Sequence, residues 1–220
     1  AVTERGGIGC EDAICGAAWL GHRGGKSLFG ALRDICANFV SHLVDFTRVV
    51  AGPACTQTLA DFGAEVIKIE NPDGGDDTRH YEHAEIGGES AAFLSLNRNK
   101  RGVVLDFNNP AALEVARELI AKADVVVENF SGGVMKKFGL DYASVAPTNP
   151  RLIYCSISAY GRKGELALRP GFDPITQAES GFMSLNGFPD GEPVRTGPPI
   201  VWRCSASSSP PPTGGVGRAP

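Results

Sequence analysis

The stretch Asp124-Val125-Val126-Val127-Glu128 decides the fold, because three consecutive β-branched apolar residues stand between two charged ones. A short, continuous apolar run of this kind is typical of a strand buried on both faces of a parallel sheet. Similar segments recur through the middle of the chain. We predict further strands at residues 43–46, 65–70, 103–105 and 152–157.

Segments of helical character alternate with these strands. Gly52-Pro53 opens one helix, because proline suits a first helical turn, and Gly63 suits its C-terminal cap. Asn109-Pro110 begins a second helix as cap and first residue. Residues 90–97 predict a short third helix, and the polar residues 71–90 predict a loop. Strands separated by helices predict βαβ units and therefore an α/β protein with a parallel sheet.

Composition excludes several classes of protein. Lys and Arg number 21 against 25 Asp and Glu, a net charge of -4, so neither a nucleic-acid partner nor a membrane surface is expected. No apolar run reaches the roughly 18 residues of a membrane span. The six cysteines form no C-x-x-C pair and no histidine cluster accompanies them. We therefore expect no metal site, no disulfide framework and a cytoplasmic protein.

Three zones differ in composition. Residues 1–42 form an atypical N-terminal flank, residues 43–201 carry the regular pattern, and residues 202–220 form a low-complexity tail rich in Ser, Pro and Gly. Such a tail cannot build a core, so we expect it to be disordered. The two flanks hold both tryptophans and four of the six cysteines. Translation in a shifted frame and ordinary disordered termini both stay open as explanations.

The segment after the first strand points to an anion site. Residues 47–53 lead directly into a helix N-terminus, at the sheet edge where ligands of such folds bind. Basic residues gather at 97–101 and at Lys136-Lys137, which suits a polyanionic ligand, and Phe130 is placed to pack on a flat ring. The alternative for each basic group is a solvated loop.

A dinucleotide site is the weaker alternative. Glu70 lies 18 residues after Gly52, near the position of a ribose-binding acid. The loop lacks the G-x-G-x-x-G pattern, however, and Pro53 removes one amide that a pyrophosphate needs. An NAD-type oxidoreductase is therefore disfavoured. The alternative for Glu70 is that it is simply a solvated acid at the end of a strand.

Three acids are candidate catalytic residues: Asp45, Asp106 and Asp173. Asp173 follows an aromatic residue at a predicted helix start, a pattern that favours an N-terminal cap. No Ser-His-Asp or Cys-His set is credible, because no histidine follows position 83.

Taken together, six segments in order resemble the family III CoA-transferases, the group that includes formyl-CoA transferase, carnitine CoA-transferase and α-methylacyl-CoA racemase. The segments are DFTRVVAGP (45–53), GAEVIKIE (63–70), GDDTR (75–79), NRNKR (97–101), DVVVENF (124–130) and RPGFD (169–173). The resemblance spans residues 43–201 and corresponds to the N-terminal part of a longer enzyme.

The resemblance implies a Rossmann-like sheet with helices on both faces, here incomplete, and an interlocked homodimer in the intact family. It implies coenzyme A as a substrate that passes between an acyl-CoA and a small carboxylic acid without a metal. An enzyme carboxylate forms an anhydride and then a CoA thioester. Asp173 matches a second acidic position of the family. The residues that match the CoA-binding positions are Arg48, Val50, Ala51, Leu105, Asn129, Phe130 and Lys137.

The sequence departs from the family at its catalytic position. Trp202 stands where the transferases carry the nucleophilic aspartate, and tryptophan cannot form an anhydride. We therefore expect a truncated chain that is inactive as written. Two alternatives remain: a racemase or epimerase of the same family, disfavoured because Ala143 occupies the neighbourhood of the required histidine, and a non-catalytic CoA-binding remnant.

Overall fold

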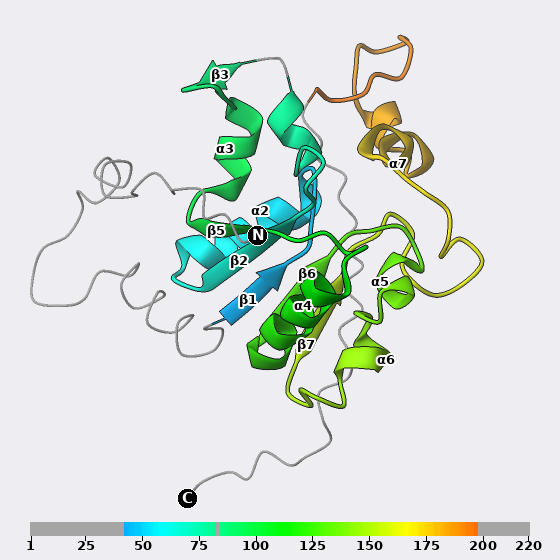
Figure 1. Cartoon of the computed structure of the whole chain (residues 1–220). Helices are drawn as coiled ribbons and strands as arrows, with labels where there is room; N and C mark the ends of the chain where they lie inside the picture. Colours follow the sequence, from blue (N-terminus) through cyan, green and yellow to red (C-terminus); the bar gives the residue numbers. More distant parts are fainter. Residues whose placement is uncertain (1–41, 82–83, 198–220) are drawn as a thin grey trace, which may run out of the picture.

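The computed structural model describes residues 42–81 and 84–197, and its main element is a five-stranded sheet in the order β5-β2-β1-β6-β7 (Figure 1). Every neighbouring pair is parallel. The strands are β1 (His42–Asp45), β2 (Glu65–Glu70), β5 (Lys100–Val104), β6 (Val125–Glu128) and β7 (Ile153–Ser156). The predicted parallel α/β fold is confirmed. Residues 1–41 and the tail with Trp202 lie outside the described residues, so the three-zone division stays a prediction.

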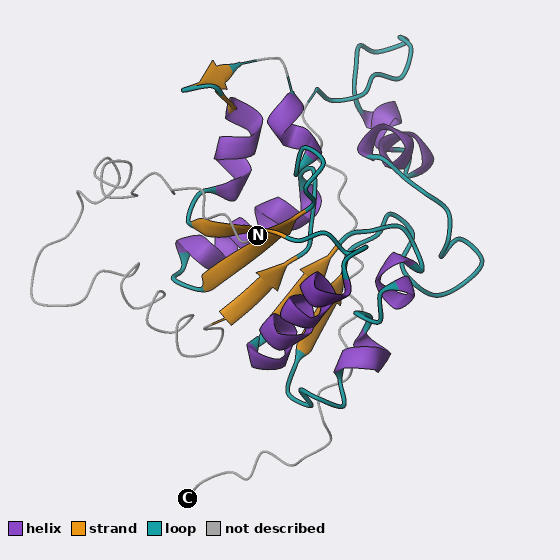
Figure 2. Ribbon diagram, viewed as in Figure 1, coloured by secondary structure: helices purple, strands orange, loops and turns teal. Residues whose placement is uncertain are grey.

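Helices connect the strands (Figure 2). They are α2 (Ala51–Asp61), α3 (Ala91–Asn97), α4 (Pro110–Lys122), α5 (Val134–Lys137), α6 (Tyr142–Val145), α7 (Asp173–Glu179) and the 3-10 turns η1 (Asp77–His80) and η2 (Phe182–Leu185). The predicted loop at 71–90 differs from the structure: it contains η1 and the short antiparallel strands β3 (Glu85–Ile86) and β4 (Glu89–Ser90). A two-residue glycine turn joins these strands, which suits a tight hairpin.

Apolar side chains cover both faces of the sheet. On one face Val44 and Val126 pack with Ala116 and Ile120 of α4. On the other face Leu43 and Val66 pack with Ala60 of α2. Because neighbouring residues of a strand point to opposite faces, each central strand contributes to both cores. The structure therefore has helices on both faces of the sheet, as expected.

Two of the predicted helix signals are confirmed and one is wrong. Asn109 caps α4, because its side chain accepts a hydrogen bond from the Ala111 amide. Gly63 follows α2 with a φ of 100°. Asp173 is not a cap: Phe172 precedes the helix and Asp173 is its first residue. The Asp173 carboxylate instead accepts from Gln177 Nε2 at 2.5 Å, one turn along the helix.

The strand order reverses between β1 and β6. From β1 the chain proceeds to β2 and β5 on one side, and then crosses to β6 and β7 on the other. The connections therefore diverge at the carboxyl ends of β1 and β6. In open α/β sheets such a switch point leaves a crevice for ligands.

Candidate ligand-binding site

A cavity of about 230 Å³ opens at this switch point. The segments that follow four strands form its wall. Thr47 and Arg48 follow β1, and Phe130 follows β6. Phe46 also follows β1, and the other lining residues come from the segments around β2 and β5 and from the start and end of α5: Ile69, Glu70, Asn71, Pro72, Asp73, Gly75, Asp76, Leu105, Asp106, Phe107, Asn108, Val134 and Phe138.

The turn between β1 and α2 is held by side chains from two other segments. Asn129 Oδ1 accepts from the Arg48 amide at 2.9 Å, and Asn129 Nδ2 donates to the Arg48 carbonyl at 2.8 Å. The next amide, that of Val49, donates to Asp76 Oδ1 at 3.0 Å. Val49 has a φ of 69°, a conformation that β-branched residues rarely adopt. The path of the turn is therefore fixed by contacts that are distant in the sequence.

Gly52 lets α2 begin against the end of β1. A Cβ atom at this position would lie 2.2 Å from the Thr47 side chain, too close for any residue with a side chain. Thr47 itself is fixed, because its hydroxyl donates to Asp45 Oδ1 at 2.5 Å. Thr56 of α2 donates to Asp45 Oδ2 at 2.6 Å. Buried Asp45 therefore ties the end of the strand to the first turns of the helix.

Two buried ion pairs lie beneath the turn. Lys100 Nζ is 3.1 Å from Asp45, and Lys68 Nζ is 2.9 Å from Asp76; all four side chains are at most 2% exposed. Burial lowers the pKa of Lys100 to about 8, against the opposing effect of Asp45. Burial alone raises the pKa of each aspartate, but the facing lysines and hydrogen bonds outweigh it, so both pKa values lie below normal.

The basic segment 97–101, which we predicted to suit a polyanionic ligand, lies away from the cavity, and its cations are paired with carboxylates. Lys100 is buried against Asp45, and Arg98 pairs with Asp61 at 2.5 Å. Arg101 pairs with Glu65 at 2.6 Å. None of the segment lines the cavity, because it lies at the start of β5, whereas the cavity lies at the carboxyl ends of the strands. Carboxylates that are distant in sequence but adjacent in the fold thus neutralise these cations.

Glu70 lines the cavity but is bound by the protein. Arg79 makes two hydrogen bonds of 2.8 Å to its two carboxylate oxygens. Burial by itself raises the pKa of Glu70. The hydrogen bonds and the charge of Arg79 lower it by more than that, so the pKa lies below normal. Glu70 is therefore neither a solvated strand-end acid nor a free ribose-binding group, which further weakens the dinucleotide alternative.

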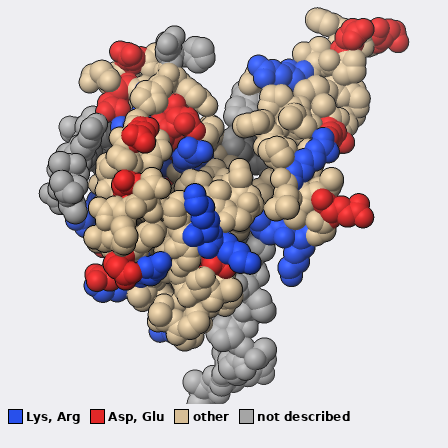
Figure 3. Space-filling view, turned by 45° about the vertical axis from the view of Figure 1, so that its right-hand side comes forward, with Lys and Arg blue, Asp and Glu red and all other residues tan. Residues whose placement is uncertain are grey.

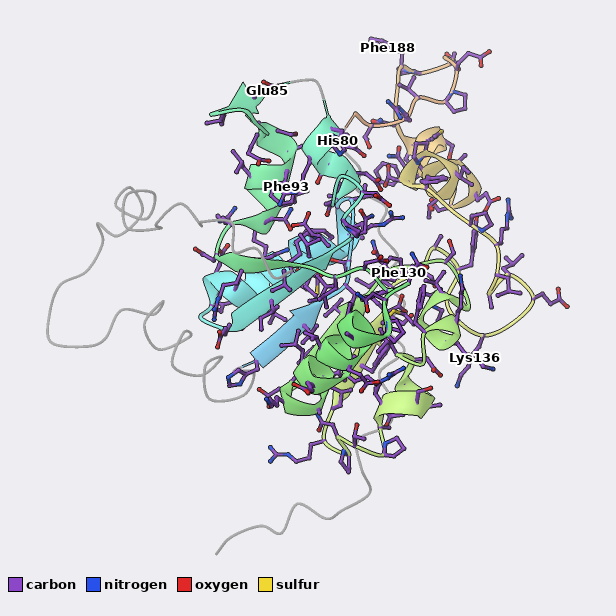
Figure 4. The ribbon with its side chains drawn as sticks, viewed as in Figure 1. His80, Glu85, Phe93, Phe130, Lys136 and Phe188 are labelled. Carbon is purple, nitrogen blue, oxygen red and sulfur yellow. The ribbon has the colours of Figure 1, made fainter. Side chains whose placement is uncertain are left out.

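Phe130 is positioned by a further ion pair, between partly buried Arg162 and buried Glu128. Its amide donates to Glu128 Oε2 at 2.9 Å, and its carbonyl accepts from Arg162 Nη2 at 2.7 Å. Arg162 and Glu128 are themselves 3.0 Å apart. The Arg48 guanidinium lies 5.7 Å from the centre of the Phe130 ring. Figure 4 shows Phe130 above the end of β6, and Lys136 pointing outward from α5.

The residues matched to coenzyme binding fall into three groups. Arg48, Leu105 and Phe130 line the cavity. Val50 and Ala51 stand at the start of α2, and Asn129 is occupied by the Arg48 backbone. Lys137 ends α5 on the exposed surface, 5.2 Å from the ring centre of Phe138, which lines the cavity. The structure thus brings these residues to one edge of the sheet.

Asp173 does not line the cavity. It begins α7, which lies away from the sheet in Figure 1. Sequence reasoning missed the aromatic wall formed by Phe107 and Phe138, whose ring centres are 5.3 Å apart. The position of Phe107, directly after a strand and Asp106, is the signal that points to it. Asp76 was not among the predicted site residues either, although it lies in the GDDTR segment (75–79) that contributes to the family resemblance.

Charge around the site is mixed in sign. Figure 3 shows acidic and basic side chains interspersed over one face of the molecule. In the described part of the chain, Arg48 is the one positively charged residue that lines the cavity. Its guanidinium lies 3.8 Å from Asp77, and both side chains are about half exposed. An incoming anion therefore competes with a solvent-exposed carboxylate, which is a weak competitor.

Two further findings concern residues 42–81 and 84–197 alone. Within them, no group of three or more His, Cys, Asp or Glu side chains is placed to hold a metal ion. Nor is any helix of that part long and apolar enough to cross a membrane.

Comparison with known proteins identifies the family. The profile of CoA-transferase family III matches residues 41–209. The chain is 47% identical over 161 residues to the succinate–glutarate CoA-transferase of Agrobacterium fabrum, covering 70% of this chain and 40% of the relative. It is 40% identical over 182 residues to the human succinyl-CoA:glutarate CoA-transferase, covering 80% of this chain and 42% of the relative.

A solved structure supports the same family assignment. A CAIB/BAIF family protein from Brucella suis superposes with a TM-score of 0.68 and 45% identity, covering 71% of this chain and 42% of that protein. The chain thus spans about 40% of the length of these relatives. The match of sequence and fold over most of the regular zone is decisive: this chain belongs to CoA-transferase family III.

Proposed function

We propose that the protein moves CoA between an acyl-CoA and a carboxylic acid, and that the described part supplies the CoA-binding site. The observation that carries this proposal is the cavity at the switch point, walled by Phe130 and Phe107 with Arg48 at its edge. Its volume of about 230 Å³ is below the range of roughly 300–1,000 Å³ typical for drug-sized ligands. One end of CoA, the adenosine, suits this space, and the remainder extends outside it.

Each matched residue has a role consistent with this ligand. The Phe130 ring offers a flat apolar surface to adenine, and Leu105 adds apolar contact. Arg48 binds a phosphate through charge-assisted hydrogen bonds. The Val50 and Ala51 amides stand at the start of an 11-residue helix, where unpaired N–H groups favour anions. Lys137 adds a mobile positive charge for a second phosphate.

The reaction that the family resemblance implies is covalent. An enzyme carboxylate attacks the thioester carbonyl, the C–S bond breaks, and CoA leaves as a thiolate from a mixed anhydride. The thiolate then attacks the enzyme carbonyl of the anhydride, which releases the donor acid and leaves an enzyme–CoA thioester. The acceptor carboxylate repeats these steps in reverse. Asp173 is proposed as an assisting acid. Because Trp202 stands at the nucleophile position, we expect the chain as written to bind CoA without turnover.

The proposed acids are dicarboxylates, with succinyl-CoA as the donor. This rests on the names of relatives, which include succinyl-CoA:glutarate and succinyl-CoA–L-malate CoA-transferases. A homodimer is also proposed. It is supported by large apolar side chains that stand free in the 166–194 segment: Leu168, Leu185 and Phe188 are 80–89% exposed. Phe188 lies at the tip of this segment in Figure 4.

Calorimetry with CoA and with NAD tests the proposal on the purified chain. We expect CoA to bind and NAD to show no heat of binding. In parallel, incubation with succinyl-CoA and glutarate followed by chromatography should detect no glutaryl-CoA. Absence of CoA binding contradicts the proposed site, and NAD binding revives the dinucleotide alternative. Formation of glutaryl-CoA contradicts the expectation that Trp202 abolishes turnover but supports the proposed reaction.

A further inference from the structure

Val49 holds a backbone conformation that its side chain disfavours. It is a β-branched residue with a φ of 69°, and it stands directly after Arg48 in the turn between β1 and α2. A non-glycine residue with positive φ is uncommon, and a β-branched one is a genuine outlier. Such a conformation persists only where the surrounding structure enforces it, and these outliers gather at functional sites.

One buried ion pair contacts the turn on both sides of Arg48. Asp76 Oδ1 accepts from the Val49 amide at 3.0 Å, and Asp76 Oδ2 is 2.9 Å from Lys68 Nζ. The same Lys68 Nζ donates to the Thr47 carbonyl at 2.8 Å. The Lys68 and Asp76 side chains are 2% and 0% exposed. The residues before and after Arg48 are therefore attached to a single buried unit.

The Asp76 carboxylate is itself fixed. Its Oδ1 also accepts from the Thr78 amide at 3.0 Å and the Thr78 hydroxyl at 2.8 Å, and its own amide donates to Glu70 at 3.0 Å. Asp76 thus cannot follow the turn if Val49 relaxes. The ionised form of Asp76 is favoured at neutral pH, because its pKa lies below normal despite burial.

We propose that Asp76 and Lys68 are positioning residues for CoA binding: they hold Val49 in its left-handed conformation and so direct the Arg48 side chain to the cavity. This inference rests on the proposed function of the cavity. Asp76 and Arg48 both line that cavity, whereas Lys68 lies behind it. The pair acts on the ligand through the turn and not by contact from Lys68.

The test compares CoA affinity by calorimetry in four proteins: wild type, Asp76→Ala, Val49→Gly/Asp76→Ala, and Ile120→Ala. Ile120 is a fully buried residue of α4, so its truncation destabilises the fold without touching the turn. We expect Asp76→Ala to weaken CoA binding about tenfold and Ile120→Ala to change it less than twofold. The double variant should regain most of the affinity, because glycine adopts positive φ without an anchor. A double variant as weak as Asp76→Ala overturns the proposal.

A ligand-free measurement separates this proposal from the proposed function. Hydrogen exchange should show a protected Val49 amide in wild type and in Ile120→Ala, and an unprotected one in Asp76→Ala. If wild type does not bind CoA, the proposed function is contradicted. If the Val49 amide stays protected in Asp76→Ala, the positioning role is contradicted, whether or not CoA binds. If Asp76→Ala does not fold, Val49→Gly decides: a higher urea midpoint than wild type supports an enforced left-handed Val49, and a lower one overturns it.

Discussion

The side-chain amide of Asn129 forms two hydrogen bonds with the backbone of Arg48, one to its N–H at 2.9 Å and one to its carbonyl at 2.8 Å. These residues are 81 positions apart: Asn129 directly follows β6, and Arg48 lies in the turn after β1, and these are the two strands that flank the switch point. The pair therefore joins the two halves of the site. The family resemblance assigns Asn129 to coenzyme binding, yet the oxygen and the nitrogen of its side-chain amide both bind the protein backbone.

Asn129→Ala should weaken CoA binding, because the Arg48 turn loses both hydrogen bonds. We expect a loss of about tenfold in affinity and about 1–3 kcal/mol in stability. Asn149→Ala is the matched control. Its amide makes two backbone hydrogen bonds, of 3.1 and 2.7 Å, near the amino ends of the strands. Calorimetry and urea denaturation should show similar destabilisation in both variants but weakened affinity only in Asn129→Ala. Equal affinities would place Asn129 outside the site.

Gly52→Ala should be strongly destabilising, because the added Cβ would lie 2.2 Å from the side chain of Thr47. A forced shift of this kind in a packed region costs roughly 1–3 kcal/mol. Gly102→Ala is the control, since its Cβ would meet only Glu70 Oε1 at an ordinary 3.6 Å. Urea midpoints should fall for Gly52→Ala and change little for Gly102→Ala. A Gly52→Ala protein with wild-type stability would show that the close approach to Thr47 is absent in solution.

Lys137→Glu should reduce CoA affinity by replacing attraction to a phosphate with repulsion. In the described part of the chain Lys137 has no ion pair, and its ammonium group lies 5.2 Å from the centre of the Phe138 ring. Lys122→Glu, exposed at the end of α4, changes the net charge equally but, unlike Lys137, is not next to a residue that lines the cavity. Calorimetry at two salt concentrations should show a larger, salt-sensitive loss for Lys137→Glu. Equal effects would reduce the role of Lys137 to general charge.

The lowered pKa of buried Lys100 should make the stability of the protein depend on pH under alkaline conditions. Its pKa falls from an ordinary 10.5 to about 8 in the folded protein. Between these values the unfolded chain binds more protons than the folded one, so the contribution of Lys100 to stability rises with pH. The slope is at most about 1.4 kcal/mol per pH unit.

Lys100→Arg supplies the reference for this prediction, because arginine stays protonated throughout the range. Urea denaturation of both proteins at pH 8, 9 and 10 should show wild type gaining stability relative to the variant. A difference that is constant across this range would mean that Lys100 titrates normally in the folded state.

The elements of the fold were predictable from local sequence. The apolar run at 125–127, the alternation at 65–70 and the Asn109-Pro110 helix start each place an element within a few residues of its observed bounds. Local signals suffice here because periodicity and capping depend on near neighbours. They failed for the hairpin at 85–90 and for the helix boundary at Asp173, where one residue changes a cap into a first helical position.

The site was predictable only in part. Arg48, Leu105 and Phe130 were matched by resemblance and line the cavity, and the edge of the sheet follows from the strand order. The electrostatics were not predictable. Lys68 lies in an alternating strand where a charge is normally solvated, yet its side chain is 2% exposed against Asp76. Residues 97–101 appeared to form a cationic patch, yet their charges are neutralised by acids 36–55 residues away in sequence.

The sequence by itself determined the class of fold, the positions of its strands and helices, and the family, because these depend on patterns within a short stretch of chain. Only the tertiary structure decided which charges are buried and paired, which face the cavity, and that Val49 is held at a positive φ by Asp76. The physical reason is that the free energy of a charge depends on its surroundings. Those surroundings come from β1, β2 and β6 together and from no single segment of the sequence.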